Sequence, residues 1–224
     1  MSHPIRKPFF FIGVVLWLTV FSALAVVVFT RTASKRGDDS TDISMNGGRV
    51  SVVNDGTGLP YLFDLPPFEM VNQSNATVTD QKLRGGPVVL CFIFTNCAGP
   101  CPIMTAKMAK LHKEVTDPKV KFLSVSVDPD RDTAEVLTEY GKQFEADFTR
   151  WWFLTTPDVR RVYQLSAGLR LAAMPADGET PIIHSEKLVL VDSNGRVRGM
   201  YSSNMEDEVK QLVADVRALA EVAK

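Results

Sequence analysis

The longest apolar segment of the chain covers residues 9–29 and contains no charged side chain. About 20 apolar residues in a helix span the core of a bilayer, so the segment predicts a transmembrane helix over residues 9–30, preceded by a tail of residues 1–8. A cleaved signal peptide is the alternative, because Ala23-Leu24-Ala25 resembles a cleavage site. The apolar run continues to Phe29, beyond the usual length of a secretory signal, which favours an uncleaved anchor.

Residues 31–60 are polar and rich in glycine, apart from a short apolar patch at residues 50–53. This composition predicts a tether that leads into a folded domain of residues 61–224. The patch predicts either a strand or a segment that packs on the domain. The first apolar run of the domain, residues 87–94, is continuous, as expected of a strand buried on both faces.

The rest of the domain alternates between helical and extended patterns. Met104, Met108, Leu111 and Val115 recur at helical spacing and predict a helix over residues 102–115. The later patterns predict strands at 120–127, 151–154, 187–191 and 197–201, and helices at 132–144, from Pro157, and at 206–222. Asp192-Ser193-Asn194-Gly195 predicts a hairpin turn. This order predicts an α/β, thioredoxin-like fold with a central mixed sheet flanked by helices.

The formal net charge of −1 hides an asymmetry between the ends of the chain. Residues 1–36 contain five basic and no acidic residues, which leaves 20 basic and 26 acidic residues in the remainder. An acidic domain lacks the basic surface that nucleic-acid binding requires, so that class of partner is excluded. Basic residues flank both ends of the apolar segment, so charge alone does not orient the anchor.

Two of the three cysteines lie where a strand is expected to give way to a helix. Pro102 is expected at the first helical position, which places Cys101 near the helix N-terminus, where the helix dipole stabilises a thiolate. Three residues separate Cys97 from Cys101, so either a shared metal or a disulfide is compatible with the spacing. A purely stabilising disulfide is disfavoured, because such a short loop removes little unfolded-state entropy. Cys91 lies within the apolar strand and is expected in the core.

His184 is the histidine best placed to join this pair. It precedes the next-to-last strand, which in a thioredoxin-like sheet lies beside the strand that leads to the cysteines. Two thiolates and one imidazole suit copper, because sulfur favours Cu(I) and nitrogen supports Cu(II). His3 precedes the predicted anchor, and His112 is expected to be half-exposed on the first helix. The candidate metal ligands are therefore Cys97, Cys101 and His184.

The acidic segment after the second strand partly resembles a calcium loop. Calcium is rejected because Thr133 occupies the position that requires glycine. Asp132 or Thr133 is expected to cap the second helix, with Glu135 completing a capping box from Asp132. Asp128 is expected to face the cysteine loop and to support the ligands.

The sequence resembles the Sco/SenC family of copper proteins over about residues 61–222. The matching segments are Phe94-Thr95-Asn96-Cys97-Ala98-Gly99-Pro100-Cys101-Pro102, Ser126-Val127-Asp128-Pro129-Asp130-Arg131-Asp132-Thr133, and His184 before Leu188-Val189-Leu190-Val191-Asp192. The resemblance implies a thioredoxin-like fold with copper, as Cu(I) or Cu(II), on Cys97, Cys101 and His184. It also implies a domain in the periplasm or mitochondrial intermembrane space, and a metallochaperone for the binuclear copper site of cytochrome c oxidase. The implied partners are a copper donor protein and the copper-accepting subunit of the oxidase.

An alternative function is a membrane-tethered thiol–disulfide oxidoreductase in which Cys97 and Cys101 are the redox-active pair. Two departures from ordinary thioredoxins disfavour it: the cysteines are spaced by three residues instead of two, and His184-Ser185-Glu186 stands where those enzymes place a proline. No other catalytic residue is predicted. A copper-dependent redox sensor is a third alternative that the sequence leaves open.

Overall fold

The computed structural model describes residues 40–45, 48–174 and 183–223, and side chains within 54–173 and 185–223. Residues Ser40–Lys224 form one compact unit. Within the described part of the chain, no helix is both long enough and apolar enough to cross a membrane. The predicted anchor of residues 9–30 lies outside the described residues, as does His3.

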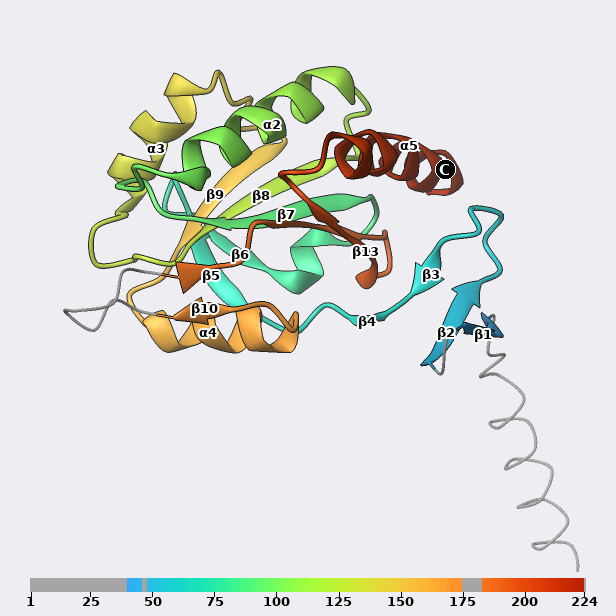
Figure 1. The fold of residues 1–224 in the computed structure, drawn as a ribbon. Coiled ribbons are helices and arrows are strands. Elements are labelled where there is room, and N and C mark those ends of the chain that lie inside the picture. Colours follow the sequence, from blue (N-terminus) through green and yellow to red (C-terminus); the bar gives the residue numbers. More distant parts are fainter. Residues whose placement is uncertain (1–39, 46–47, 175–182, 224) are drawn as a thin grey trace, which may run out of the picture. The chain divides into compact units, whose positions relative to one another are not determined.

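A mixed sheet forms the centre of the molecule (Figure 1). Its middle strands are β7 (Val88–Ile93), β8 (Lys121–Ser126), β9 (Trp151–Thr155), β12 (Lys187–Val191) and β13 (Arg196–Ser202). β7, β8 and β9 are parallel, whereas β12 is antiparallel to β7 and forms a hairpin with β13. The predicted thioredoxin-like arrangement, with the next-to-last strand beside the strand that leads to the cysteines, is therefore present.

Three short strands complete this sheet, and other strands form a separate smaller sheet. β4 (Phe63–Asp64), β5 (Glu69–Asn72) and β6 (Thr77–Thr79) extend the sheet to the order β4-β13-β12-β7-β8-β9-β5-β6, and the 3-10 helix η1 (Asp80–Leu83) follows β6. β1 (Ser40–Met45), β2 (Gly48–Val53) and β3 (Pro60–Tyr61) form a separate three-stranded sheet. The segment predicted as a tether thus contains a β-hairpin, and its apolar patch at residues 50–53 belongs to β2.

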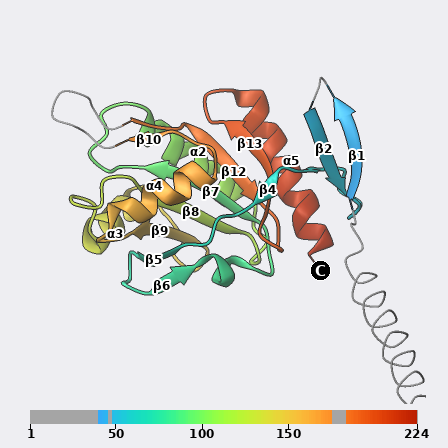
Figure 2. The same cartoon turned by 90° about the horizontal axis from the view of Figure 1, so that it is seen from below.

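The two faces of the sheet carry different helices. α2 (Pro100–Glu114), α3 (Ala134–Gln143) and α5 (Glu206–Val222) lie on one face, and α4 (Val159–Gly168) covers the other (Figures 1 and 2). Successive strand residues point to opposite faces, so alternate residues of β7 enter two separate apolar clusters, one on each side of the sheet. All six residues of β7 are buried, which confirms the predicted two-sided burial and the place of Cys91 in the core.

The first helix begins earlier than predicted. Gly99 is its N-cap residue and Pro100 occupies the first helical position, so the prediction that Pro102 starts the helix is wrong. Proline is tolerated throughout the first turn, because the N–H groups there have no intrahelical partner. Both prolines therefore fit, and Cys101 becomes the second residue of α2.

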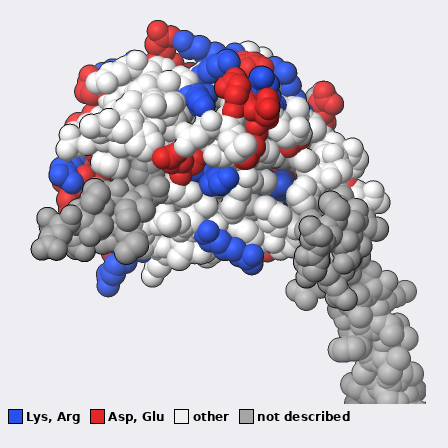
Figure 3. Space-filling model, in the orientation of Figure 1, with Lys and Arg blue, Asp and Glu red and all other residues white. Residues whose placement is uncertain are grey.

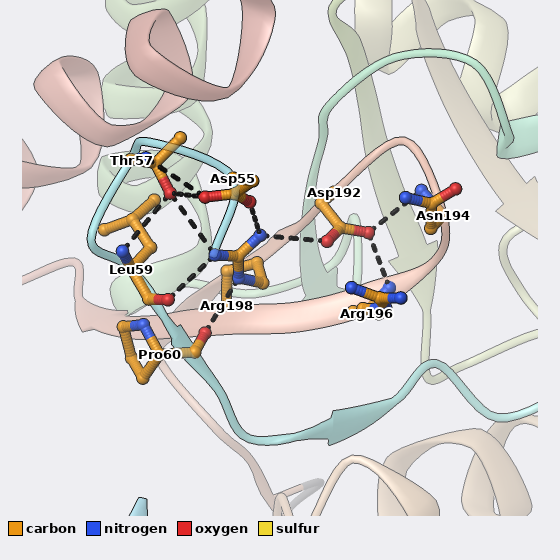
Figure 4. Close-up of polar contacts among 8 residues, drawn as sticks. All are labelled: Asp55, Thr57, Leu59, Pro60, Asp192, Asn194, Arg196 and Arg198. Carbon is orange, nitrogen blue, oxygen red and sulfur yellow. Dashed lines mark hydrogen bonds and ion pairs between the residues drawn. The ribbon is translucent and has the colours of Figure 1, made fainter. Parts of the chain in front are cut away.

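A buried arginine joins β13 to the chain that enters the domain (Figure 4). The side chain of Arg198 is fully buried and forms ion pairs with Asp55 at 2.7 Å and Asp192 at 3.0 Å. Its remaining guanidinium hydrogen bonds go to Thr57 Oγ1 and to the carbonyl oxygens of Leu59 and Pro60. These contacts compensate the buried positive charge of Arg198 and attach residues 55–60 to the sheet.

Asp192 also shapes the hairpin between β12 and β13. Its second carboxylate oxygen accepts hydrogen bonds from the backbone N–H groups of Asn194 and Arg196, each at 2.9 Å. Gly195 adopts a φ of 76°, a conformation that favours glycine. The predicted hairpin turn is confirmed, and its aspartate has a second function as a partner of Arg198.

Candidate metal centre

The cysteine loop connects the end of β7 to the start of α2. No disulfide joins Cys91, Cys97 and Cys101. Cys97 is partly exposed, whereas Cys101 is completely buried. The backbone N–H of Gly99 donates to Cys97 Sγ at 3.4 Å, and the Cys101 thiol forms hydrogen bonds with the Cys97 side chain and the Phe94 backbone. The loop therefore makes the two cysteine side chains neighbours.

Burial controls the protonation of Cys101. It raises the pKa of the Cys101 thiol far above the ordinary value; the Phe94 backbone hydrogen bond lowers it, and the contact with Cys97 raises it further. Burial of Cys101 thus opposes the thiolate stabilisation that is predicted for the helix N-terminus. A metal ion that binds here has to displace a proton.

Topology brings the backbone of His184 to the same edge of the sheet as the cysteine loop. His184 ends β11 (Ile183–His184), which pairs antiparallel with β10 (Ala173–Met174). Because β12 runs antiparallel to β7, the segment that precedes β12 lies at the edge where β7 ends. The side chain of His184 lies outside the described residues. Among the side chains that are described, no cluster of three His, Cys, Asp or Glu residues could hold a metal ion.

His112 is buried, so the prediction that it is half-exposed is wrong. Its Nε2 accepts a hydrogen bond from Arg150 Nη2 at 3.2 Å, and its ring makes an edge contact with Phe122. Arg150 reaches His112 from 38 positions along the chain and also donates to the Val115 carbonyl. Burial, together with the charge of Arg150, lowers the pKa of His112. His112 is therefore a core residue whose surroundings favour the neutral form of its ring.

Asp132 is a residue of the site that the sequence analysis assigned to another role. Its fully buried carboxylate accepts hydrogen bonds from the Thr95 N–H at 3.2 Å, the Thr95 hydroxyl at 2.5 Å and the Ser126 hydroxyl at 2.5 Å. Burial raises the pKa of Asp132, while these hydrogen bonds lower it. The N-cap of α3 is Thr133, which confirms one of the two expected caps, whereas the predicted capping box from Asp132 is wrong.

Asp128 lies in the turn after β8. Its carboxylate forms an ion pair with Arg131 Nε at 2.5 Å, and its backbone N–H donates to Ser126 Oγ at 3.0 Å. A supporting role of Asp128 towards the metal ligands stays a prediction.

The face that α2 and α5 present to solvent has mixed charge. Figure 3 shows Lys and Arg side chains interspersed with Asp and Glu over these helices. Ion pairs join the two helices, from Lys110 to Glu206 and from Arg217 to Glu114. This alternation differs from the continuous basic surface typical of nucleic-acid-binding proteins.

A thioredoxin-like fold with a dithiol at the junction of a strand and a helix defines a class of redox or metal-binding proteins. The sequence model of the SCO1/SenC family matches residues 64–221. The chain belongs to the SCO1/SenC family.

Two curated relatives match most of the folded domain. The SCO1 protein homolog of Bacillus subtilis is 28% identical over 162 residues, covering 71% of this chain and 84% of that protein. A protein of Stutzerimonas stutzeri that is named for copper binding is 29% identical over 147 residues, covering 63% of this chain and 70% of its own length.

Two solved structures have the same fold. A SCO1/SenC family lipoprotein from Bacillus anthracis is 33% identical with a TM-score of 0.65, and the match covers 70% of this chain and 95% of that one. BsSco, described as having a disulfide switch and as a member of the Sco family of cytochrome c oxidase assembly proteins, is 28% identical with a TM-score of 0.63, covering 70% and 94% of the two chains.

Proposed function

We propose that this protein carries copper for the assembly of the binuclear copper site of cytochrome c oxidase, and that it binds the metal with Cys97, Cys101 and His184. One observation carries the proposal: Cys97 and Cys101 are neighbouring thiols with no disulfide between them, at the sheet edge that the His184 backbone also reaches. The copper-binding relative and the oxidase-assembly role of BsSco support it.

The donor set fits a soft, transferable cargo. Thiolates select Cu(I), and an added imidazole suits Cu(II). The partial exposure of Cys97 gives a partner cysteine access to one ligand, while the buried Cys101 is shielded from solvent. The partners of the proposal are a copper donor protein and the copper-accepting subunit of the oxidase, with the domain held in the periplasm or intermembrane space by the N-terminal anchor.

Anaerobic titration of the reduced protein with Cu(I) tests the ligand assignment. We expect one copper ion per chain, and loss of that binding in Cys97→Ser and Cys101→Ser. Cys91→Ala is the matched control, because Cys91 is a free thiol in the core; this variant should keep the stoichiometry. Full occupancy with unchanged affinity in either ligand variant would show that the site is misassigned.

A thiol–disulfide oxidoreductase is the second candidate, and the combination of a partly exposed thiol with a neighbouring buried one favours it. His184→Ala separates the two functions. Simple thiol–disulfide exchange needs only an attacking thiolate and a leaving thiol, whereas Cu(II) binding uses nitrogen. The carrier proposal expects Cu(II) affinity to fall much more than Cu(I) affinity, with the reduction rate of a model disulfide unchanged. Unchanged affinity for both copper states together with slow disulfide reduction would favour the enzyme, and a thermal melt of the variant excludes unfolding as the cause.

A further inference from the structure

We propose that Asp132 is a positioning residue for the cysteine pair: its carboxylate fixes Thr95, and through Thr95 it sets the placement of Cys97 and Cys101. The copper readout of this inference rests on the proposed function, whereas its redox readout does not.

The contacts link Asp132 to both sulfurs through one short segment. Thr95 donates both its backbone N–H and its hydroxyl to the same carboxylate. Phe94, the residue before Thr95, provides the backbone hydrogen bond to the Cys101 thiol. Cys97 is the second residue after Thr95. A shift of Thr95 therefore moves Cys97, which follows it closely in the chain. It also moves Phe94 and so alters the hydrogen bond to the Cys101 sulfur.

The same carboxylate continues the pairing of two parallel strands beyond their backbone ladder. The ladder between β7 and β8 ends at Ile93 and Ser126, and Val127 N–H donates to the Ile93 carbonyl at 2.8 Å. Further along, the connection runs from Thr95 through the Asp132 carboxylate to the Ser126 hydroxyl at 2.5 Å. The start of the cysteine loop is thus fixed to the end of β8 by side-chain contacts.

Because Asp132 is completely buried, its carboxylate depends on hydrogen bonds from the protein. The Asp132 side chain has no exposed surface, so its oxygens have to be satisfied by protein donors, and Thr95 and Ser126 supply them. Loss of one donor leaves the carboxylate under-bonded and favours a new loop position. The expected result of weakening the link is therefore a changed geometry at the sulfurs in addition to a lower stability.

Three substitutions in the full-length protein, purified in detergent, test the inference. Thr95→Val removes the hydroxyl with little change of shape, and Asp132→Asn removes one acceptor. Ser124→Ala is the matched control: Ser124 is also fully buried in β8, but its hydroxyl contacts Trp151 Nε1 at 3.0 Å and Cys91 Sγ at 3.6 Å. Each variant is measured for its unfolding free energy in urea and its Cu(I) affinity against a competing chelator. Its equilibrium with glutathione is also measured, in which the Cys97–Cys101 disulfide and two glutathione thiols exchange to two cysteine thiols and one glutathione disulfide.

A positioning role predicts that Thr95→Val and Asp132→Asn each change the Cu(I) affinity and the glutathione equilibrium constant by roughly tenfold. Ser124→Ala should lower stability and leave both constants within about twofold, since it lies outside the link. The double variant Thr95→Val/Asp132→Asn should change the constants by less than the product of the single effects, because both substitutions break the same contact.

Altered unfolding free energy with both constants unchanged in Thr95→Val and Asp132→Asn would overturn the inference and leave Asp132 a structural residue. If either variant does not fold, Ser126→Ala takes its place with the same two outcomes; it removes one donor to the Asp132 carboxylate and also the acceptor of the Asp128 N–H. Absence of copper binding in the unsubstituted protein would refute the proposed function alone, because the glutathione equilibrium still reports on the positioning of the two sulfurs.

Discussion

At the scale of single residues, the two site cysteines differ most in their access to solvent. Cys97 is partly exposed and receives a hydrogen bond from the Gly99 backbone, whereas Cys101, the second residue of α2, is fully buried. A partner that approaches the loop therefore meets Cys97 first. This asymmetry suits both transfer of a metal ion and thiol exchange, since each begins at an accessible sulfur.

The reactivity of the cysteines should follow this order. In the reduced, copper-free protein, iodoacetamide should modify Cys97 first and Cys101 roughly tenfold or more slowly, because a buried thiol is less accessible and less ionised. Cys91, whose pKa burial raises to about 12, should react only after unfolding. Peptide mass spectrometry of timed samples, with a urea-denatured control, measures the order. Equal rates at Cys97 and Cys101 would contradict it.

The buried His112 should contribute to the pH dependence of stability. Its folded pKa lies below the ordinary value of 6.5, owing to burial and Arg150, so the unfolded chain takes up a proton at a higher pH than the folded one. The contribution of neutral His112 to the free energy of unfolding is then fully present above about pH 6.5. It falls as the pH drops towards the folded pKa, by at most about 1.4 kcal/mol per pH unit. The other charged groups near His112 are Asp147, which raises its pKa, and Lys113, which lowers it.

His112→Gln keeps an acceptor for Arg150 and removes the titration. Urea unfolding followed by circular dichroism at pH 7.5, 6.5 and 5.5 should give a flatter pH dependence for this variant than for the unsubstituted protein. The pKa of Asp147 is lowered, by hydrogen bonds from Thr149 first, so its own titration falls below this window. Equal slopes for the two proteins would show that His112 does not titrate on unfolding.

The site residues that the sequence could identify are those with a local pattern. Cys97 and Cys101 are recognised by their spacing at the junction of a strand and a helix. Asp132 was assigned to the nearest helix because its real partner, Thr95, is 37 positions away. The hydrogen-bond partner of the buried His112 ring is similarly distant, because Arg150 is 38 positions away. Contacts between residues so far apart in the sequence follow from strand pairing and cannot be deduced from neighbouring residues.

At the scale of elements, apolar periodicity predicted the central strands and helices well. The strand of residues 187–191 and the helix of residues 206–222 match β12 and α5, and the turn at Asp192–Gly195 correctly joins β12 to β13. The short strands β4, β5 and β6 were not predicted. They have two to four residues each, too few for an alternating pattern, and pairing with a neighbouring strand makes them extended.

The contacts of Arg198 should be the most sensitive polar link between elements. Removing its charge in Arg198→Met leaves the carboxylates of Asp192 and Asp55 without their cation in or near the interior, and breaking such a buried pair typically costs about 3–5 kcal/mol. We expect a loss of this size in the free energy of unfolding, measured by urea denaturation.

A surface ion pair provides the control for Arg198. Arg160 pairs with Asp158 at 2.9 Å while its side chain is 81% exposed, so Arg160→Ala should leave the unfolding midpoint nearly unchanged. Comparable destabilisation by Arg198→Met and Arg160→Ala would show that burial of the Arg198 network adds nothing to its strength.

At the scale of the whole molecule, the proposed function combines a membrane anchor with a folded metal-binding domain. The structure describes the domain, in which Ser40–Lys224 are one compact unit that contains both cysteines and the His184 backbone. The predicted anchor precedes this unit in the chain, so the domain could carry its cargo whether or not the anchor is retained. The proposed membrane attachment and the proposed copper binding therefore call for separate tests.

The full-length chain should stay in the membrane fraction after alkaline carbonate washing. Residues 9–29 carry no charge and are long enough to span the bilayer core, and carbonate releases proteins that are held only by surface charge. Replacing Leu16 and Val20 by Arg puts two charges near the centre of the span, which typically costs about 2.5–3.5 kcal/mol for each charge, and should release the protein into the wash. A fragment that begins at Ser40 should also be soluble and should bind copper with the same stoichiometry. Amino-terminal sequencing of the mature protein decides the alternative: a terminus at or directly after Ala25 would show that the segment is a cleaved signal peptide.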